Sequence, residues 1–491
     1  MINLKQYRGL CKASDLILNA ASDNDEIVSI PMLHVLREHP QCLKLYEFIF
    51  NKRSNYRAQS INFFKKSVGL IKSTLFDCKV SNIPKNLNKD SKKLIIVSHI
   101  TNPNQCSNIE DEYFGNLHND LLSFSNIQPI VLLINQTSIS SSKLSKKLSI
   151  NNIDRIVIPK SSGLFNELKI FFKLFISVSS FTRSLKLKDS VASSMLNTIS
   201  KPSTFLSGMS ALRIGFFVEK IVKITNSNYI FTTYEGHSRE RIIFSSARKA
   251  NQEILCFAYQ HSILNKFQYA LTKSMHKKYN PDHIFCCGRI TKDLLSNLNS
   301  LNDIKISILG SPKGLPISIL KNPIDGNKNL TFLFLPEGME SEYQIFYKFI
   351  LECSKVFPNS NFIWRSHPLL DIEKLDFFKR KILPSNITIS KNLFDQDVGT
   401  SNIAIYRGTA AIIRAVMGNL TPIYLQIKDE IGIDIMHSLK LNRVFSASDL
   451  KSIIQTVDLQ ENMENNIKFC QNYFKPIEYK SLIKVTGHYD F

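Results

Sequence analysis

The sequence predicts an α/β protein with two successive domains, each built on a mostly parallel sheet, and a helical appendage at the N-terminus. From about residue 91, short β-type runs alternate with helical stretches, which is the pattern of βαβ units. A segment rich in Pro, Gly and Asn interrupts this alternation at residues 313–328, and a second series of β-type runs follows it. The 491 residues are also too many for one hydrophobic core.

Each part of the chain has its own pattern. Residues 1–90 show apolar residues at helical spacing and no clear strand, so we expect an appendage rather than a catalytic unit. The appendage contains a His39-Pro40 pair between helical segments, which we interpret as structural. Residues 91–312 form the first α/β domain, residues 313–328 a linker, and residues 329–491 the second α/β domain with closing helices. Two such domains joined by a linker suggest a cleft between two sheets.

The net charge of +21 indicates an anionic partner: nucleic acid, an acidic membrane or a phosphorylated substrate. The alternative is a composition rich in Lys, Ile, Asn and Ser that carries no such meaning. The lysines are dispersed and no aromatic-basic motif of an RNA-binding module is present, so we do not expect a nucleic-acid partner.

The cysteines and the apolar runs indicate where the protein works. Nine Cys are scattered without a CxxC pair, which is typical of a reducing compartment and predicts neither disulfides nor a zinc cluster. The start of the chain lacks the pattern of a signal peptide, and no apolar run reaches the roughly 18–20 residues that a membrane helix needs. We therefore expect a cytoplasmic protein.

One segment qualifies that expectation. Residues 161–190 are helical, rich in Phe and basic, a combination that can lie on an anionic membrane surface. Its alternative role is a helical pair packed on the sheet with solvated lysines. The first interpretation predicts a peripheral protein at the inner face of the cell membrane.

Two polar strand ends in the second domain predict a phosphate-binding edge. The runs NFIWRSHP and IAIYRGTAA end in polar residues, and the carboxyl ends of parallel strands meet at one edge of a sheet. Helix N-termini at that edge attract phosphate. The candidate residues are Arg365, His367, Pro368, Arg407, Gly408 and Thr409. A third tip, Glu337, either accepts hydrogen bonds from ribose hydroxyls or caps the next helix.

The first domain offers catalytic candidates at its own strand ends. Glu235 follows a β-type run and precedes a glycine, so its carboxylate is expected to face the cleft as general base or nucleophile. His261 would share the proton transfer or bind donor phosphate. The alternatives are a helix-capping role for Glu235 and a position at the edge of the core for His261. His99, Asp111 and His237 are weaker candidates for binding an acceptor.

Several common motifs are missing: GxGxxG, GxxxxGK[ST], HExxH and GxSxG do not occur. Asp395-Gln396-Asp397 matches a DxD pattern that binds a metal and diphosphate in another class of sugar transferase. The match is short, common and set in a polar stretch, so we assign no metal ligands.

With these residues the chain resembles bacterial glycosyltransferases of the GT-B shape, which consist of two facing Rossmann-like domains. More narrowly it is similar to the group with an HP motif and a later Ser/Thr motif, which includes sialyltransferases, Kdo transferases and related surface-polysaccharide enzymes. The resemblance covers about residues 94–450 and rests on His367-Pro368, the Gly408-Thr409 tip, YEGHSRE and AYQHS. It departs at RGTAA, which stands where the group has a doubled serine.

The resemblance implies a metal-independent glycosyltransferase that uses a nucleotide-sugar donor and no cofactor. In such families the HP histidine and the later Ser/Thr hold the donor's phosphate, commonly that of CMP, and a carboxylate of the N-terminal domain acts in catalysis. The expected reaction moves a sugar to a glycan or lipid-linked acceptor in surface-polysaccharide or lipopolysaccharide biosynthesis. Two alternatives stay open: a CDP-polyol phosphotransferase of the same shape, and a non-catalytic nucleotide- or glycan-binding protein.

Overall fold

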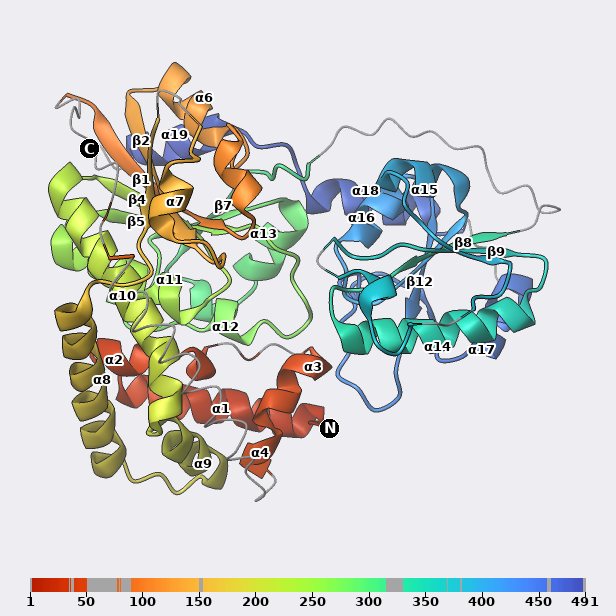
Figure 1. Cartoon of the computed structure of the whole chain (residues 1–491), viewed down its shortest axis with the longest axis horizontal. Coiled ribbons are helices and arrows are strands. Elements are labelled where there is room, and N and C mark those ends of the chain that lie inside the picture. The colour runs from red at the N-terminus through yellow and green to blue at the C-terminus, as the bar shows by residue number, and fades with distance from the viewer. Residues whose placement is uncertain are drawn as a thin grey trace.

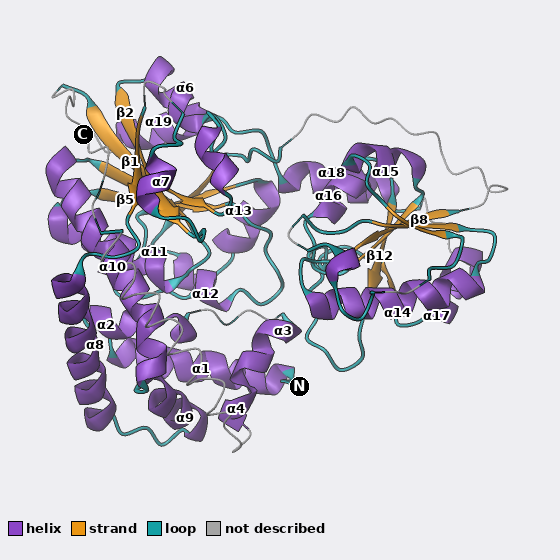
Figure 2. Cartoon of the chain, viewed as in Figure 1, coloured by secondary structure: helices purple, strands orange, loops and turns teal. Residues whose placement is uncertain are grey.

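The computed structural model has two α/β domains and a helical N-terminal region (Figure 1; Figure 2). It describes residues 2–34, 36, 39–50, 77–78, 80, 90–149, 153–314, 330–368, 370–379, 382–456 and 461–488. The predicted linker therefore lies almost wholly outside the described residues, and so does much of the second half of the predicted appendage. The predicted α/β fold class, with a parallel Rossmann-like sheet in each of two domains and helices at the N-terminus, is confirmed.

The N-terminal domain contains a seven-stranded sheet in the order β3-β2-β1-β4-β5-β6-β7, with every pairing parallel. Its strands are β1 (Lys92–Ile100), β2 (Ile127–Asn135), β3 (Asp154–Ile158), β4 (Tyr229–Thr233), β5 (Leu255–Gln260), β6 (His283–Cys286) and β7 (Lys305–Ile308). Its helices are α6 (Leu117–Phe124), α7 (Ser141–Ser145), α8 (Leu164–Ser184), α9 (Ser190–Ile199), α10 (Pro202–Thr225), α11 (Ser238–Ala250), α12 (Tyr269–Thr272) and α13 (Arg289–Ser296).

The C-terminal domain contains a six-stranded parallel sheet in the order β10-β9-β8-β11-β12-β13. Its strands are β8 (Thr331–Leu335), β9 (Asn361–Trp364), β10 (Ile387–Ile389), β11 (Ile403–Tyr406), β12 (Thr421–Leu425) and β13 (Asn442–Val444). Its helices are α14 (Glu340–Val356), α15 (Phe394–Thr400), α16 (Ala411–Met417), α17 (Ala447–Thr456) and α18 (Met463–Tyr473). The last helix of the chain is α19 (Tyr479–His488).

In each sheet the strand order reverses once, between β1 and β4 in the first and between β8 and β11 in the second. Side chains beyond the carboxyl ends of these four strands line a crevice, the usual position of a ligand in an open α/β sheet. The strands are near-continuous apolar runs because helices cover both faces; β4, β11 and β12, for example, are buried along their whole length. The topology therefore selects the strand ends that carry the predicted site.

The N-terminal helices are α1 (Leu4–Ala20), α2 (Asp25–Val28), α3 (Pro40–Leu43) and α4 (Glu47–Phe50). They are not a separate unit, because their buried side chains form one core with α8, α9 and α10, which includes Leu10, Ile17, Leu174 and Met195. The hydroxyl of Tyr7 on α1 lies 3.0 Å from the carbonyl oxygens of Leu36 and Phe267. The appendage is thus fastened to a loop of the N-terminal domain.

The closing helices divide between the domains, which differs from the expected boundary at residues 329–491. Helix α18 packs on α16 in the C-terminal domain, whereas Leu482 of α19 is buried in the core of the N-terminal domain with Leu94 and Phe114. The backbone N–H of Glu478 also donates to the carbonyl of Leu309 at 2.8 Å. The chain therefore returns to its first domain at its end.

Six short 3₁₀ helices complete the described elements: Pro31–Leu33, Lys44–Tyr46, Pro103–Ser107, Lys277–Tyr279, Asn299–Leu301 and Ile372–Lys374. All nine cysteines are free thiols. Among the described helices, none combines the length and the hydropathy that crossing a bilayer requires.

Candidate functional site

A cavity of about 170 Å³ lies between the two domains and brings together residues that are far apart in the sequence. The strand ends of the N-terminal domain contribute Glu235 and His237, and those of the C-terminal domain contribute Glu337 and Gly408. The appendage contributes His39. We call this space the interdomain cavity. It joins four of the predicted site residues, two from each predicted half.

The loop that carries Glu235 is held in one conformation by Glu240 of α11. The buried carboxylate of Glu240 accepts hydrogen bonds from the backbone N–H groups of Glu235, at 2.9 Å, and His237, at 2.8 Å. Between them Gly236 has φ +78°, and a Cβ atom there would overlap the carbonyl oxygen of Ala270. Only glycine therefore fits this turn.

The carboxylate of Glu235 does not cap helix α11. His237, not Glu235, is the N-cap residue of α11. The Glu235 side chain lies in the interdomain cavity, where it is 25% exposed, and Nε2 of His237 lies 2.9 Å from its Oε2. The pair forms a carboxylate–imidazole dyad at the cavity wall.

Three aromatic rings lie beside this dyad. His261 stacks on Tyr113 with the ring centres 4.9 Å apart, and His99 meets Tyr113 edge-on at 5.6 Å. Burial lowers the pKa of His99 to about 3 and that of His261 to about 4, although the charge of Glu235 opposes the shift at His261. Both imidazoles are therefore neutral at neutral pH.

The polar atoms of His99 and Asp111, the residues predicted to bind an acceptor, make hydrogen bonds within the N-terminal domain. Nε2 of His99 lies 3.1 Å from the hydroxyl of Thr233, and its Nδ1 accepts from the amide of Gln136 at 3.0 Å. Oδ1 of Asp111 accepts from the Ser98 hydroxyl and from the backbone N–H groups of Tyr113 and Phe114, at 2.8–3.0 Å. Asp111 thus fixes the loop that presents Tyr113 to both histidines.

Arg239 is a residue that the sequence interpretation missed. It is the second residue of α11, and its positive charge contributes to the lowered pKa of His99. Its buried Nε makes no hydrogen bond with any described residue, and no ion pair of the described residues includes Arg239. The only signal in the sequence was its position shortly after Glu235.

On the opposite wall, His39 bridges the appendage and the C-terminal domain. Its Nδ1 accepts from the backbone N–H of Gln41 at 3.1 Å, which caps α3 and leaves the proton on Nε2. That Nε2 lies 3.0 Å from Oε2 of Glu337 and 3.7 Å from Oε1 of Glu342. The interpretation of His39-Pro40 as purely structural is therefore incomplete, because helical periodicity does not reveal that α3 folds back to the cleft (Figure 1).

Gly408 leaves the space that the side chain of Glu337 occupies. A Cβ atom at Gly408 would overlap Oε1 of Glu337. Glu337 follows β8 and Gly408 follows β11, and these strands are paired at the point where the order of the sheet reverses. The glycine therefore leaves room for the carboxylate of Glu337 at the end of the sheet, and Glu337 lines the interdomain cavity there.

Arg365 and Arg407, the arginines predicted to bind phosphate, are paired with carboxylates in the structure. Arg407 is only 1% exposed; its guanidinium bonds to the carboxylates of Glu342 at 2.6 Å and Glu430 at 2.8 Å. Arg365 bonds to the buried carboxylate of Asp397 at 2.6 Å. These carboxylates neutralise both arginine charges. The pairing was not predicted, because the acids lie elsewhere in the sequence.

The same contacts account for the DxD pattern. Asp397 pairs with Arg365 and accepts from the Ser390 hydroxyl, and Asp395 pairs with Arg414 at 2.6 Å. No three His, Cys, Asp or Glu side chains of the described residues come together as a possible metal site.

The remaining predicted residues lie around the cavity. The ring of His367 packs against Gly338, and burial lowers its pKa while Glu337 opposes that shift. Thr409 is nearly buried and its hydroxyl accepts from the backbone N–H of Ala411 at 3.3 Å. Pro368 is exposed. None of these three residues lines the interdomain cavity.

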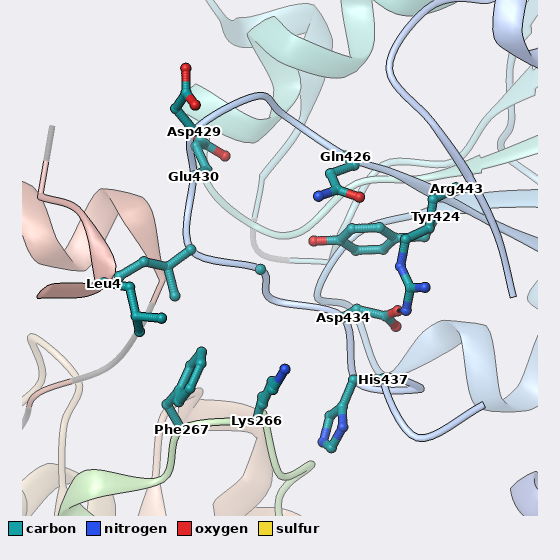
Figure 3. A pocket seen from close by; sticks show the side chains of 12 residues that line it. Leu4, Lys266, Phe267, Tyr424, Gln426, Asp429, Glu430, Asp434, His437 and Arg443 are labelled. Atoms are coloured by element: carbon teal, nitrogen blue, oxygen red, sulfur yellow. Dashed lines mark hydrogen bonds and ion pairs between the residues drawn. The ribbon is translucent and has the colours of Figure 1, made fainter. Parts of the chain in front are cut away.

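Figure 3 shows a larger cavity of about 530 Å³. It adjoins the first, since Phe267 lines both. Lys266 and Phe267 approach it from the N-terminal domain, and Tyr424, Gln426 and Arg443 from the C-terminal domain (Figure 3). Arg443 is paired with Asp434 at 2.8 Å. Nζ of Lys266 lies 5.6 Å from the centre of the Phe267 ring. Lys266 forms no ion pair with the described residues. It is a second cation that the sequence interpretation missed.

No protein-family model matches this chain, and no curated protein sequence matches it either. Solved structures that are similar include the glycotransferase of kitacinnamycin, with 9% identity, 81% of this chain and 99% of that chain covered, and a TM-score of 0.46. The S. aureus MnaA–UDP co-structure has 10% identity, 81% and 96% coverage and a TM-score of 0.46. Acinetobacter baumannii MurG has 12% identity, 80% and 99% coverage and a TM-score of 0.44. At these levels the likenesses carry no information about activity.

Proposed function

We propose that this protein is a glycosyltransferase that moves a sugar from a nucleotide-activated donor to a hydroxyl group of a glycan or lipid-linked acceptor. The observation that carries the proposal is the interdomain cavity, in which Glu235 lies on one wall and Glu337 with Gly408 on the other. A carboxylate facing a separate donor-binding wall suits sugar transfer from a nucleotide-activated donor.

The chemistry assigned to Glu235 is proton removal. Its carboxylate accepts the proton of the acceptor hydroxyl while the acceptor oxygen forms a bond to the anomeric carbon of the sugar. The bond between that carbon and the donor's phosphate oxygen breaks, and the nucleotide leaves with the electron pair. His237, 2.9 Å from the carboxylate, holds it in place. If the reaction instead retains the anomeric configuration, the same carboxylate acts as the nucleophile.

The donor is assigned to the two adjoining cavities, with its nucleotide in the larger one and its sugar in the smaller. A volume of about 530 Å³ is within the usual range for a small-molecule site. Lys266 supplies a positive charge for the phosphate, a role that Arg365 and Arg407 are too fully paired to take. Glu337 lines the smaller cavity and accepts hydrogen bonds from hydroxyl groups of the donor sugar there, and the ring of His367 lies next to it, against Gly338.

The test compares Glu235→Gln with wild type in a sugar-transfer assay. Removing a general base is expected to lower the turnover by about 10²–10⁴-fold, while the affinity for the nucleotide stays within twofold of wild type. Glu253→Gln, at an exposed carboxylate after α11, is the matched control and should leave turnover unchanged. Wild-type turnover in Glu235→Gln would refute the catalytic role.

The products separate the remaining alternatives. A glycosyltransferase joins the sugar without phosphorus, whereas a CDP-polyol phosphotransferase leaves a phosphodiester in the product. A non-catalytic binder gives nucleotide binding and no product. Surface-polysaccharide or lipopolysaccharide assembly, and the CMP-linked donor, stay predictions.

A further inference from the structure

Helix α8 presents an uncovered apolar face to the outside of the molecule. Six of its large apolar side chains are between 42% and 81% exposed: Leu164, Phe165, Leu168, Phe172, Phe175 and Ile176. We call this set the α8 stripe. Contiguous exposed apolar surface of this kind marks an interaction site in soluble proteins.

The stripe is one continuous face rather than scattered positions. At 100° per residue, its members fall within about 120° of the helix circumference, and they repeat at each turn from Leu164 to Ile176. The opposite face is anchored: Leu174 and Val178 are fully buried, and the buried carboxylate of Glu167 bonds to the guanidinium of Arg213. Packing therefore holds the helix in place while the stripe points outward.

The segment that carries the stripe is mostly basic, and the acidic Asp189 that follows it caps α9. Residues 164–188 contain five basic side chains: Lys169, Lys173, Arg183, Lys186 and Lys188. Their single acidic residue is Glu167, which is buried and paired with Arg213. Lys173 is also bonded to Glu26 but remains mostly exposed. An apolar stripe beside basic side chains is the pattern of a helix that lies in the plane of an anionic lipid surface.

From these features we propose that α8 docks the protein on an anionic membrane. The stripe enters the boundary between headgroups and acyl chains, and the basic residues contact lipid phosphates. Helix α8 lies at the edge of the N-terminal domain that is remote from the C-terminal domain (Figure 1). Docking through α8 would therefore leave the C-terminal domain free of the bilayer. The inference rests on the proposed function in one respect, because docking brings the protein to the membrane surface where a lipid-linked acceptor lies.

The test is flotation of the full chain with vesicles of phosphatidylcholine alone or with 30% phosphatidylglycerol, in 50 and 500 mM NaCl. Wild type is expected to float with the anionic vesicles and to lose much of that binding in 500 mM NaCl. Phe165→Ser/Phe172→Ser/Ile176→Ser is expected to lower the partition coefficient on the order of a hundredfold. Lys169→Gln/Lys186→Gln/Lys188→Gln is expected to remove the preference for anionic lipid.

The matched control is Ile382→Ser/Phe445→Ser, which removes exposed apolar side chains from the C-terminal domain and should leave flotation unchanged. Absence of wild-type flotation, or an equal loss in the control, overturns the proposal. So does sedimentation showing that the stripe variant turns a dimer into a monomer, because a second copy would then cover the stripe. Circular dichroism verifies that each variant is folded.

Nucleotide binding and transfer to a water-soluble acceptor separate this inference from the proposed function. Both should be unchanged in the stripe variant, because α8 contributes no residue to either cavity. Flotation without nucleotide binding would refute the proposed function alone, and nucleotide binding without flotation would refute the membrane inference alone.

Discussion

Lowering the pH from 7 to 5 should destabilise the N-terminal domain through His99. Burial lowers the pKa of this histidine from 6.5 to about 3, so its ring stays neutral between Gln136 and Thr233 in the folded state. The unfolded chain binds a proton that the folded chain does not. The stabilising contribution is therefore fully present above pH 6.5 and is lost as the pH falls toward the folded-state pKa.

The size of the effect follows from these two pKa values. Since pH 7 and pH 5 both lie above the folded-state pKa, the loss equals the extra free energy of protonating the unfolded imidazole. That free energy is about 0.2 kcal/mol at pH 7 and about 2 kcal/mol at pH 5. A difference of about 2 kcal/mol corresponds to a Tm shift of about 4–8 °C for a domain of this size.

Calorimetric melts of wild type and His99→Gln at pH 7, 6 and 5 measure the contribution. His99→Gln should melt lower than wild type at pH 7 but lose about 4–8 °C less on going to pH 5. Buried His34 and His283 contribute the same background to both proteins. The exposed His276→Gln is the control and should follow wild type. Identical pH dependence in wild type and His99→Gln would refute the reasoning.

Three further substitutions test the geometry of the site. Gly236→Ala should destabilise the protein by about 2–4 kcal/mol, because alanine is strained at positive φ and its Cβ would overlap a carbonyl; an unchanged melting temperature would contradict this. His39→Ala should lower the rate of sugar transfer about tenfold, the usual loss for one bond to a charged group, whereas equal rates in His39→Ala and wild type would leave His39 without a role. Arg407→Lys should destabilise the C-terminal domain by about 3–5 kcal/mol, because a lysine cannot satisfy both buried carboxylates. Fluorescence of Trp364, the single tryptophan, reports that unfolding; normal stability combined with lost nucleotide binding would restore Arg407 to the phosphate site.

Residues whose position depends on topology were predictable from the sequence. The alternation of β-type runs and helices indicated two parallel sheets, and in such sheets the strand ends beside the reversal of strand order meet at one crevice. Glu235 and Glu337 follow strands of that kind, and Gly408 follows a third. Their convergence in the interdomain cavity is a consequence of strand order, which local patterns encode.

Residues whose role depends on a distant partner were not predictable. Arg407 has the right type and position for phosphate, but Glu342, 65 residues earlier, already neutralises it. His39 belongs to helices whose packing against the cleft depends on the tertiary core shared with α8 to α10. Lys266 stands in a loop without periodicity, where sequence alone does not indicate which side chain meets a cavity.

The central claim is that a nucleotide-activated donor binds where the two domains meet. Its most direct test is isothermal titration of CMP, CDP, UDP and GDP into wild type and Lys266→Ala. We expect at least one of these nucleotides to bind wild type, and the resemblance favours cytidine nucleotides. Lys266→Ala should weaken this binding about tenfold or more, because a bond to a charged group is lost. Binding of none of the four nucleotides, or equal affinity in wild type and Lys266→Ala, would contradict it.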